Sequence, residues 1–547
     1  MTTTTTTTTD RAAVLDAMHV GDIRGALGTI RLDDTAPRRG LSRKIKTLLA
    51  IVGPGLIVMV GDNDAGAFAT YGQAGQNYGT HLLWTLLLLV PVLYVNQEMV
   101  LRLGAVTGVG HARLILERFG RFWGAFSVID LFILNALTIV TEFIGITLAA
   151  GYLGLPKVPA VILAALVIVA AAFTGSFRRF ERIAVTFCLG SLLLIPIYLL
   201  AHPHASQMAH DFVVPQMPAG SGGMATLMLL IIGIVGTTVA PWQLFFQQSY
   251  VIDKRITPRF MKYEKADLWI GIVIVVLGAA AIMGASATAF AGTKGFGNFD
   301  DAGDVATGLA AYAGKAAGAL FAVALLDAAI IGAFAVSLST AYALGDVLGL
   351  NHSLHRGVKQ AKGFYAVYGL LIAVAATIVL IPGSPLGLLT EGVQVLAGVL
   401  LPSASVFLLL LCNDKDVLGP WVNGRRLNAF TSAVVAVLVT LSVVLTASVL
   451  FPGITANQIM DIMAGCGLVA LAALGFALTA RRRGAKAVPA APVDRTGRED
   501  WRMPPLAELG RATMSSGRKL GMGALRSYLA VAMIMVIVKI VQSALAH

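Results

Sequence analysis

The chain has 547 residues, of which 57% are hydrophobic and 13% are charged, and its formal net charge is +12. The charged share is about half that of an ordinary soluble domain, so the composition excludes a water-soluble globular protein and indicates a polytopic membrane protein. The positive charge does not indicate a nucleic-acid partner, because lysine and arginine cluster in short loops between apolar runs.

The first 45 residues form a polar segment that opens with a threonine tract. This segment lacks the charged and apolar regions of a cleaved signal peptide. Its end is basic, with Arg38, Arg39, Arg43, Lys44 and Lys46 before and at the start of the first apolar run. We therefore expect residues 1–45 to remain as a cytoplasmic N-terminal segment ahead of the first membrane span.

Twelve apolar runs follow, each long enough to cross a hydrocarbon core of about 30 Å. They cover residues 46–70, 81–103, 122–150, 158–175, 182–201, 224–250, 266–291, 316–347, 363–381, 386–411, 428–450 and 456–480. The connections after even-numbered runs carry most of the lysine and arginine residues, so the positive-inside rule places both ends of the twelve-span core in the cytoplasm. We expect a multi-pass protein of the plasma membrane, namely the inner membrane of a bacterium.

The first and sixth runs are each interrupted at their centres. Residues 61–66 of the first run read GDNDAG, and residues 236–241 of the sixth read GTTVAP. Glycine and aspartate disfavour a continuous membrane helix, and Pro241 removes an amide donor and clashes with the preceding turn. We expect both helices to unwind at these points.

The two interruptions lie five spans apart, which predicts that the second copy enters the membrane from the opposite side. This spacing indicates an all-α transport core, residues 46–411, with two inverted five-helix repeats, spans 1–5 and 6–10. The two breaks then meet near the middle of the membrane. Unwound backbone exposes carbonyl oxygens, and Asp64 adds a negative charge, so the meeting point is a candidate cation site.

The C-terminal quarter adds segments to this core. Residues 412–480 are predicted to form accessory helices 11 and 12, and residues 481–547 a basic cytoplasmic tail. The tail composition suits a solvated linker and a segment attracted to anionic lipid headgroups equally well. A thirteenth apolar run, residues 527–546, is interrupted by Lys539, and its length fits both a membrane crossing and a surface helix.

Several motifs, in order, resemble a known family. They are DAGAFAT and GQAGQNYGTHLLW in the first two runs, TEFIG at residues 141–145, RRFERIA at 178–184, APWQLFFQQS at 240–249, and Gln394 eight residues before Pro402. Over about residues 46–450 the chain is similar to the natural resistance-associated macrophage protein (NRAMP) family of divalent-metal transporters. The resemblance implies a LeuT-type fold with broken helices 1 and 6 and additional C-terminal helices.

The resemblance also implies a set of site residues. Asp64 stands at the position of the family's metal-binding aspartate, while Ala67, Ala240 and Trp242 replace its asparagine, methionine and histidine. Gly61 and Thr237 stand where backbone carbonyls contribute, Gln394 where an amide joins the site, and Asp62 and Glu142 where supporting or pathway groups lie. Plainer roles remain open: Asp64 as a helix cap, Glu142 and Gln394 as bonds between helices, and Trp242 as a space-filling ring.

These departures change the expected substrate. Without the soft thioether the site offers only oxygen ligands and more room, which suits a partly hydrated Mg²⁺. The pattern is similar to the NRAMP-related magnesium transporter branch, in which Mn²⁺ also passes. Trp242 in place of histidine and Ile139 in place of an acid remove much of the family's proton route, so we expect transport without proton coupling.

Other functions remain as alternatives. One is a proton-coupled Mn²⁺ or Fe²⁺ transporter of the NRAMP type; the others are a sodium-coupled organic-solute symporter and a non-transporting metal sensor. The chain shows no zinc-protease or nucleophile-turn motif, so we do not expect an enzyme. The expected partners are the divalent metal substrate and the lipid bilayer, with no nucleic acid and no resident cofactor, and we expect a monomer.

Overall fold

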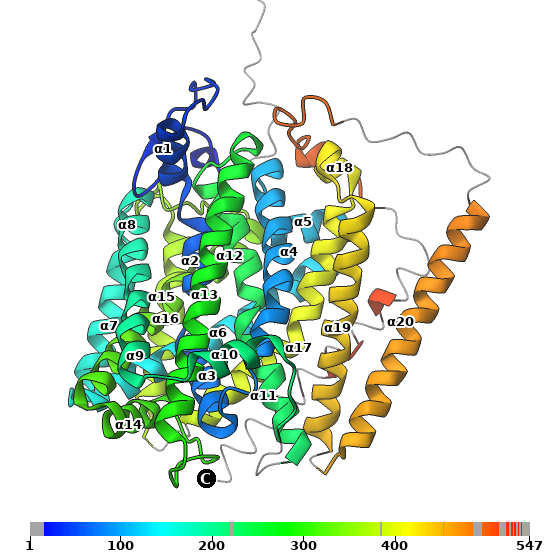
Figure 1. Cartoon of the computed structure of the whole chain (residues 1–547). Coiled ribbons are helices and arrows are strands. Elements are labelled where there is room, and N and C mark those ends of the chain that lie inside the picture. Colours follow the sequence, from blue (N-terminus) through cyan, green and yellow to red (C-terminus); the bar gives the residue numbers. More distant parts are fainter. Residues whose placement is uncertain are drawn as a thin grey trace, which may run out of the picture.

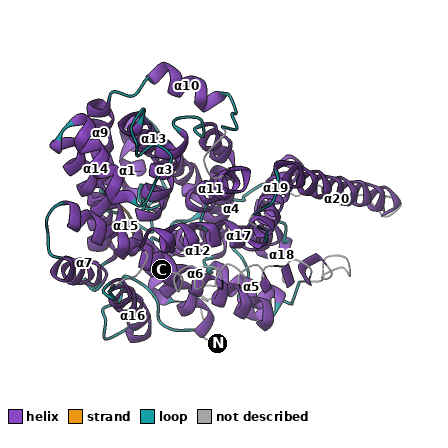
Figure 2. Cartoon of the chain, turned by 90° about the horizontal axis from the view of Figure 1, so that it is seen from below, coloured by secondary structure: helices purple, strands orange, loops and turns teal. Residues whose placement is uncertain are grey.

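The computed structural model shows an almost entirely helical bundle. It describes residues 16–218, 223–382, 386–451, 453–484, 495–512, 521–523, 527, 528, 530, 531, 534 and 538. The long helices run between two ends of the bundle, with α1 and α18 at one end and α14 at the other (Figure 1). Helix α20 stands apart from the bundle in both views (Figure 1, Figure 2).

The elements follow one another along the chain. A 3₁₀ turn (Ala17–His19) and two antiparallel strands, β1 (Ile23–Arg24) and β2 (Thr29–Ile30), come first, with Ile23 opposite Ile30. The helices are α1 (Leu41–Ile51), α2 (Pro54–Val60), α3 (Ala65–Tyr78), α4 (Trp84–Thr107), α5 (His111–Phe119), α6 (Arg121–Tyr152), α7 (Lys157–Ala172), α8 (Phe177–Cys188), α9 (Leu194–Ala201), α10 (Ala205–Val213), α11 (Gly223–Thr238), α12 (Pro241–Asp253), α13 (Met261–Phe290), α14 (Ala302–Ala313), α15 (Lys315–Leu348), α16 (Lys362–Val379), α17 (Leu386–Cys412), α18 (Lys415–Leu418), α19 (Arg425–Leu450) and α20 (Ala456–Gly484).

Each of the twelve predicted spans coincides with one helix or with two or three consecutive helical segments. Within the described ranges, ten helical stretches are long and apolar enough to cross a membrane. The first span falls short of that length because it is split into α2 and α3, and the fourth, α7, is a shorter apolar helix. The short helices α5, α10, α14 and α18 lie between spans, where apolar run length carries no signal.

The first and sixth spans are broken at the predicted places. Helix α2 ends at Val60 and α3 begins at Ala65, while α11 ends at Thr238 and α12 begins at Pro241. Proline occupies the first position of both α2 and α12. A missing amide is harmless there, since the first amides of a helix have no partner within it. Proline therefore opens the half-helix before the first break and the half-helix after the second break without weakening either of them.

The broken spans lie in the interior because small residues let helices approach them closely. A Cβ built on Gly55 of α2 would lie 2.6 Å from the backbone nitrogen of Leu268 in α13. A Cβ on Gly271 of α13 would lie 2.6 Å from the Gly55 carbonyl oxygen. Such close glycine contacts are typical of helix packing in membranes. In contrast, outward positions such as Leu277 and Leu370 are exposed apolar side chains, as lipid contact requires.

The N-terminal segment is folded from residue 16 onward, which its polar composition did not predict. Asp16 forms an ion pair with Arg356 (2.8 Å), and Arg255 donates to the Met18 carbonyl oxygen (2.8 Å). Burial by itself raises the pKa of the Asp16 carboxyl, but hydrogen bonds from Arg356 and the Met18 amide outweigh it and lower the pKa to about 2. The segment is therefore tied to the end of the bundle that carries α1.

The C-terminal tail is also partly ordered against the bundle. The Ala512 amide donates to the Arg118 carbonyl oxygen (2.9 Å), and the Trp421 indole donates to the Arg498 carbonyl oxygen (2.7 Å). Most of the thirteenth apolar run, residues 527–546, lies outside the described residues. Of those described, Tyr528 donates to the Ser442 carbonyl oxygen in α19 (2.5 Å).

Candidate metal site

The break in the first span is closed by Asp64, the residue before α3. Its Oδ1 accepts a hydrogen bond from the Ala67 amide (2.9 Å), so Asp64 caps the helix as the plainer interpretation requires. A carboxylate has about four acceptor positions, and this bond uses one. The cap therefore fixes the orientation of the side chain and leaves acceptor capacity for a cation. Ala67 is fully buried, and its amide is the group that holds Asp64.

Glu142 of α6 lies beside the same helix start. Its Oε2 accepts a hydrogen bond from the Ala65 amide (3.1 Å). Both acids converge on Gly332 of α15, where an added Cβ would lie 2.7 Å from Glu142 Oε2 and 2.8 Å from Asp64 Cβ. The amides at the start of α3 carry partial positive charge, which favours carboxylates at this point. Glu142 and Asp64 thus form one acidic pair.

The break in the sixth span faces this region through Asp62. The Gln243 side-chain amide in α12 donates to Asp62 Oδ1 and to the Thr238 carbonyl oxygen (3.3 Å). Gln97 of α4 in turn donates to Gln243 Oε1 (2.8 Å). Asp62 therefore joins the two breaks by a hydrogen bond. The sequence analysis did not single out Gln97 and Gln243, although both are polar amides within apolar runs.

The predicted amide, Gln394 of α17, lies between the two broken spans. A Cβ on Gly66 of α3 would overlap the side-chain amide of Gln394. A Cβ on Gly236 of α11 would overlap the backbone carbonyl oxygen of Gln394. Both glycines are therefore required for α17 to approach α3 and α11. The structure thus brings Gln394 against the first turn of α3, close to the helix start that Asp64 caps.

Four residues complete the predicted set: Gly61, Thr237, Ala240 and Trp242. Thr237 is buried near the end of α11, and Ala240 is the buried residue before α12. A Cβ on Gly61 would lie 3.8 Å from the Trp242 ring, so the indole packs on the break of the first span. This contact is the space-filling role that was weighed for Trp242.

The site is acidic, and no basic side chain of the described residues is paired with it. Asp62, Asp64 and Glu142 are all buried, at 0–3% exposure. No lysine, arginine or histidine in the described part of the chain forms an ion pair with them. Asp62 Oδ2 and Glu142 Oε1 have no hydrogen-bond partner among the described residues. Buried charge without a partner is costly in a membrane, so the arrangement suits a cation that arrives from outside the protein.

The two breaks bring together carboxylate and amide side chains. Among the described residues, no group of three or more His, Cys, Asp or Glu side chains is placed to hold a metal ion. A cation at the breaks would therefore depend on carboxylate oxygen together with amide and backbone carbonyl oxygens. Hard cations such as Mg²⁺ and Ca²⁺ prefer oxygen ligands of this kind.

The half-helix α2 is clamped at its start, the end away from the break, and this clamp fixes the position of the break. The Asp267 carboxylate of α13 accepts from the amides of Gly53 (3.1 Å), Gly55 (2.7 Å) and Leu56 (3.2 Å). Lys254 donates to the Val52 carbonyl oxygen (2.9 Å) and is ion-paired with Glu181 (2.7 Å). A movement of α2 relative to α13 would have to break this buried clamp.

Comparisons with known proteins agree with this architecture. The family model described as natural resistance-associated macrophage protein-like matches residues 55–448. The chain is 31% identical over 409 residues to the divalent metal cation transporter MntH of Ralstonia nicotianae, which covers 72% of this chain and 89% of the relative. It is 29% identical over 451 residues to the MntH of Burkholderia ambifaria, and this match covers 76% of this chain and 94% of the relative.

Solved structures show the same fold. The manganese transporter of Eremococcus coleocola, in complex with an aromatic bis-isothiourea substituted compound, is similar with a TM-score of 0.62 at 21% identity, over 83% of this chain and 99% of that one. MhsT in complex with L-phenylalanine is similar with a TM-score of 0.51 at 12% identity, over 72% of this chain and 98% of that one. The predicted LeuT-type fold with broken first and sixth helices is thereby confirmed.

Proposed function

The chain belongs to the natural resistance-associated macrophage protein-like family and is a divalent metal cation transporter, and from that premise we propose that its principal substrate is Mg²⁺, with Mn²⁺ also carried. The observation that carries the proposal is the buried acidic pair of Asp64 and Glu142, which has no basic partner in the described chain. A divalent cation supplies the missing positive charge. The metal is the cargo of the protein and is released after each crossing.

We assign the binding of the metal to the two breaks. Asp64 contributes the charged oxygen, with carbonyl oxygens of Gly61 and Thr237 and the amide oxygen of Gln394 as neutral ligands. Asp62 and Glu142 act on the pathway or hold water that surrounds the ion, and Trp242 closes the space beside Gly61. Because the carboxylates are buried at the middle of the bundle, the protein must open the site to one side of the membrane at a time.

The choice of Mg²⁺ follows from what is absent beside Asp64. Ala67 and Ala240 are buried alanines, so neither an amide nor a thioether side chain projects from these positions. Sulfur is a soft ligand that favours polarizable transition metals, and Mg²⁺ releases its waters reluctantly. An all-oxygen site with room for water suits Mg²⁺, while Mn²⁺ accepts the same ligands.

We further propose that the metal moves without obligatory proton coupling. Trp242 provides no titratable group, and Ile139, one turn before Glu142, is apolar. A double positive charge gains about 4.6 kcal/mol when it crosses 100 mV, at about 2.3 kcal/mol per charge. The membrane potential is therefore a sufficient driving force for inward transport.

One observation favours a second candidate, proton-coupled transport of Mn²⁺ or Fe²⁺. Glu142 lies beside Asp64 at the start of α3, and two neighbouring buried carboxyl groups share a proton readily when no metal is bound. Metal binding would then release that proton. The two candidates differ in whether the released proton crosses the membrane with the metal.

A single uptake assay separates these candidates. Purified protein in liposomes is given Mg²⁺, with Mn²⁺ and Ca²⁺ as competitors and a pH dye inside. We expect Mg²⁺ uptake with no proportional proton flux, and loss of uptake in Asp64→Ala. Asp461→Ala is the matched control, because Asp461 is exposed on α20 and should be neutral. Proton influx that rises in proportion to metal uptake would establish the second candidate.

The setting of the protein completes the proposal. The multi-span fold places it in a membrane, and its MntH relatives are bacterial. We propose the plasma membrane, with the basic N-terminal end of the bundle in the cytoplasm and the monomer as the working unit. Antibody access to a tag at the N-terminus in right-side-out and inverted vesicles tests the orientation.

A further inference from the structure

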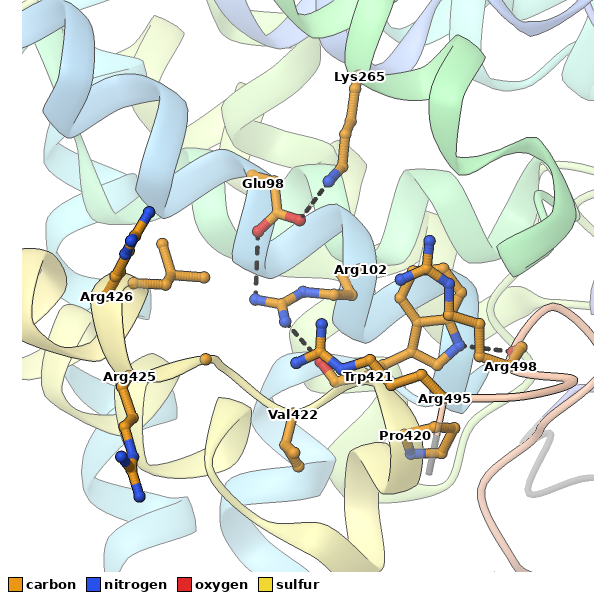
Figure 3. A pocket seen from close by; sticks show the side chains of 12 residues that line it. Glu98, Arg102, Lys265, Pro420, Trp421, Val422, Arg425, Arg426, Arg495 and Arg498 are labelled. Carbon is orange, nitrogen blue, oxygen red and sulfur yellow. Dashed lines mark hydrogen bonds and ion pairs between the residues drawn. The ribbon is translucent and has the colours of Figure 1, made fainter. Parts of the chain in front are cut away.

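A basic cavity lies at the end of the bundle that carries α18, away from the metal site. Its volume is about 570 Å³, and its walls come from α4, α13, the segment before α19 and the C-terminal tail. Six cationic side chains line it: Arg102, Lys265, Arg425, Arg426, Arg495 and Arg498. Figure 3 shows these residues around the cavity, with Glu98 as the acid among them.

Glu98 engages only two of the six cations. Its carboxylate forms ion pairs with Arg102 (3.2 Å) and Lys265 (2.8 Å). Arg102 is further fixed by bonds to the Trp421 carbonyl oxygen (2.5 Å) and the Asn423 side-chain oxygen (2.6 Å). Arg102 is therefore a buried cation held in one orientation, which makes it part of the cavity wall.

The other cations have no acidic partner. Arg425, Arg426 and Arg495 form no ion pair within the described residues, and Arg498 stacks on the Trp421 ring at 4.7 Å. Four positive side chains thus face a cavity whose single carboxylate is already engaged. An anion that enters the cavity therefore meets cationic side chains that no carboxylate of the described residues engages.

The backbone adds to the attraction. The cavity lining includes Gly424 and the first turn of α19, a 26-residue helix. The N-cap residue of this helix, Gly424, has no side chain that could cap it. The first amides of a helix have no acceptor within the helix, and the helix dipole places partial positive charge at the same point. Helix starts with free amides are common binding points for phosphate groups.

The tail arginines are held in place by a docked segment. The Trp421 indole donates to the Arg498 carbonyl oxygen (2.7 Å), and a Cβ on Gly419 would overlap the Trp501 ring. The Met503 amide donates to the Val106 carbonyl oxygen (3.5 Å). Anchored at both Trp421 and α4, the tail closes one side of the cavity and presents Arg495 and Arg498 to it.

We propose that this cavity binds a phosphate-bearing anion through the guanidinium groups of Arg426 and Arg495 and the first amides of α19. Arginine matches phosphate oxygens with paired donors, and a diphosphate group carries enough charge to engage several arginines together. The same chemistry occurs in an anionic lipid headgroup and in a soluble phosphate ester. Either source fits a site where α19 begins.

Binding to the full-length protein tests the proposal. The protein is placed in phosphatidylcholine nanodiscs, in metal-free buffer with EDTA at constant ionic strength, and titrated with radiolabelled inorganic pyrophosphate. A second arm replaces part of the phosphatidylcholine with phosphatidylglycerol and measures the shift in Tm. Arg426→Gln and Arg495→Gln are compared with Arg179→Gln, an exposed arginine of α8 outside the cavity. Tm of each variant without anion reports folding.

We expect saturable pyrophosphate binding that weakens about tenfold in each cavity variant and is unchanged in Arg179→Gln. If only phosphatidylglycerol stabilises the protein, and the cavity variants lose that stabilisation, the anion is a lipid headgroup. Absence of both effects overturns the proposal. It is equally overturned if folded Arg426→Gln and Arg495→Gln bind both probes like the unmodified protein.

Discussion

Gly332→Ala tests whether Asp64 and Glu142 form one site. The added Cβ would lie 2.7 Å from Glu142 Oε2 and 2.8 Å from Asp64 Cβ, whereas ordinary contact begins at 3.4 Å. The two acids must therefore move by about 0.6 to 0.7 Å, more than the roughly 0.5 Å that a working site tolerates. We expect Mg²⁺ uptake to fall by about ten- to a hundredfold, since misplacement of this size is costly.

The assay is initial Mg²⁺ uptake into liposomes at matched protein density. Overpacking at a buried position also costs about 1–3 kcal/mol of stability, so Tm is measured on the same preparations. Gly151→Ala is the control, because nothing lies within 4 Å of a Cβ at that helical position. We expect it to transport normally.

Two results would refute the reasoning. The first is a folded Gly332→Ala that transports at the original rate, because the acids would then tolerate separation. The second is a Glu142→Gln protein that transports normally while Asp64→Ala does not, because Glu142 would then be outside the site. The second variant preserves the size of the side chain and removes only its charge.

Three further predictions concern other parts of the molecule. Ala240→Met adds a soft ligand, so we expect Mn²⁺ to compete better against Mg²⁺ uptake; an unchanged competition curve argues against a metal contact there. Gln243→Leu leaves a buried carboxylate without its donor and should cost about 1–3 kcal/mol of stability, measured as a drop in Tm. Gln247→Leu is its control, since the Gln247 amide has no partner among the described residues and its loss should be nearly neutral. Burial lowers the pKa of His352, but the Asp346 carboxylate at 2.8 Å outweighs it and raises the pKa from 6.5 to about 9. The resulting stabilisation, about 3 kcal/mol at 1.36 kcal/mol per unit, is complete below pH 6.5 and is lost as the pH rises through 9. His352→Gln should remove this part of the pH dependence of unfolding.

The clamp on α2 links the fold to transport. Asp267 holds three amides at the start of α2, and the Lys254–Glu181 ion pair is fully buried beside it. Breaking one partner of a buried ion pair is strongly destabilising. The clamp therefore holds the start of α2 against α13, and any movement of α2 relative to α13 must replace these bonds with others.

The sequence alone was sufficient to predict the membrane character, the twelve apolar runs and the positions of both breaks. These are local properties: apolar run length decides what crosses a membrane, and Gly61, Asp64 and Pro241 interrupt helices wherever they stand. The placement of Asp64 at a break, as the residue that caps α3, also followed from the sequence. It needed no knowledge of what surrounds the break.

Only the tertiary structure decided which side chains meet there. Gln243 reaches Asp62 across 181 residues, and Glu142 reaches the Ala65 amide across 77. The basic cavity likewise lies between α4 and the C-terminal tail. The composition of that tail shows only that it is polar and basic. Such contacts depend on how the helices pack. Close approach at glycines and hydrogen bonds between distant segments are set by distance in space, and they leave no periodic signal along the chain.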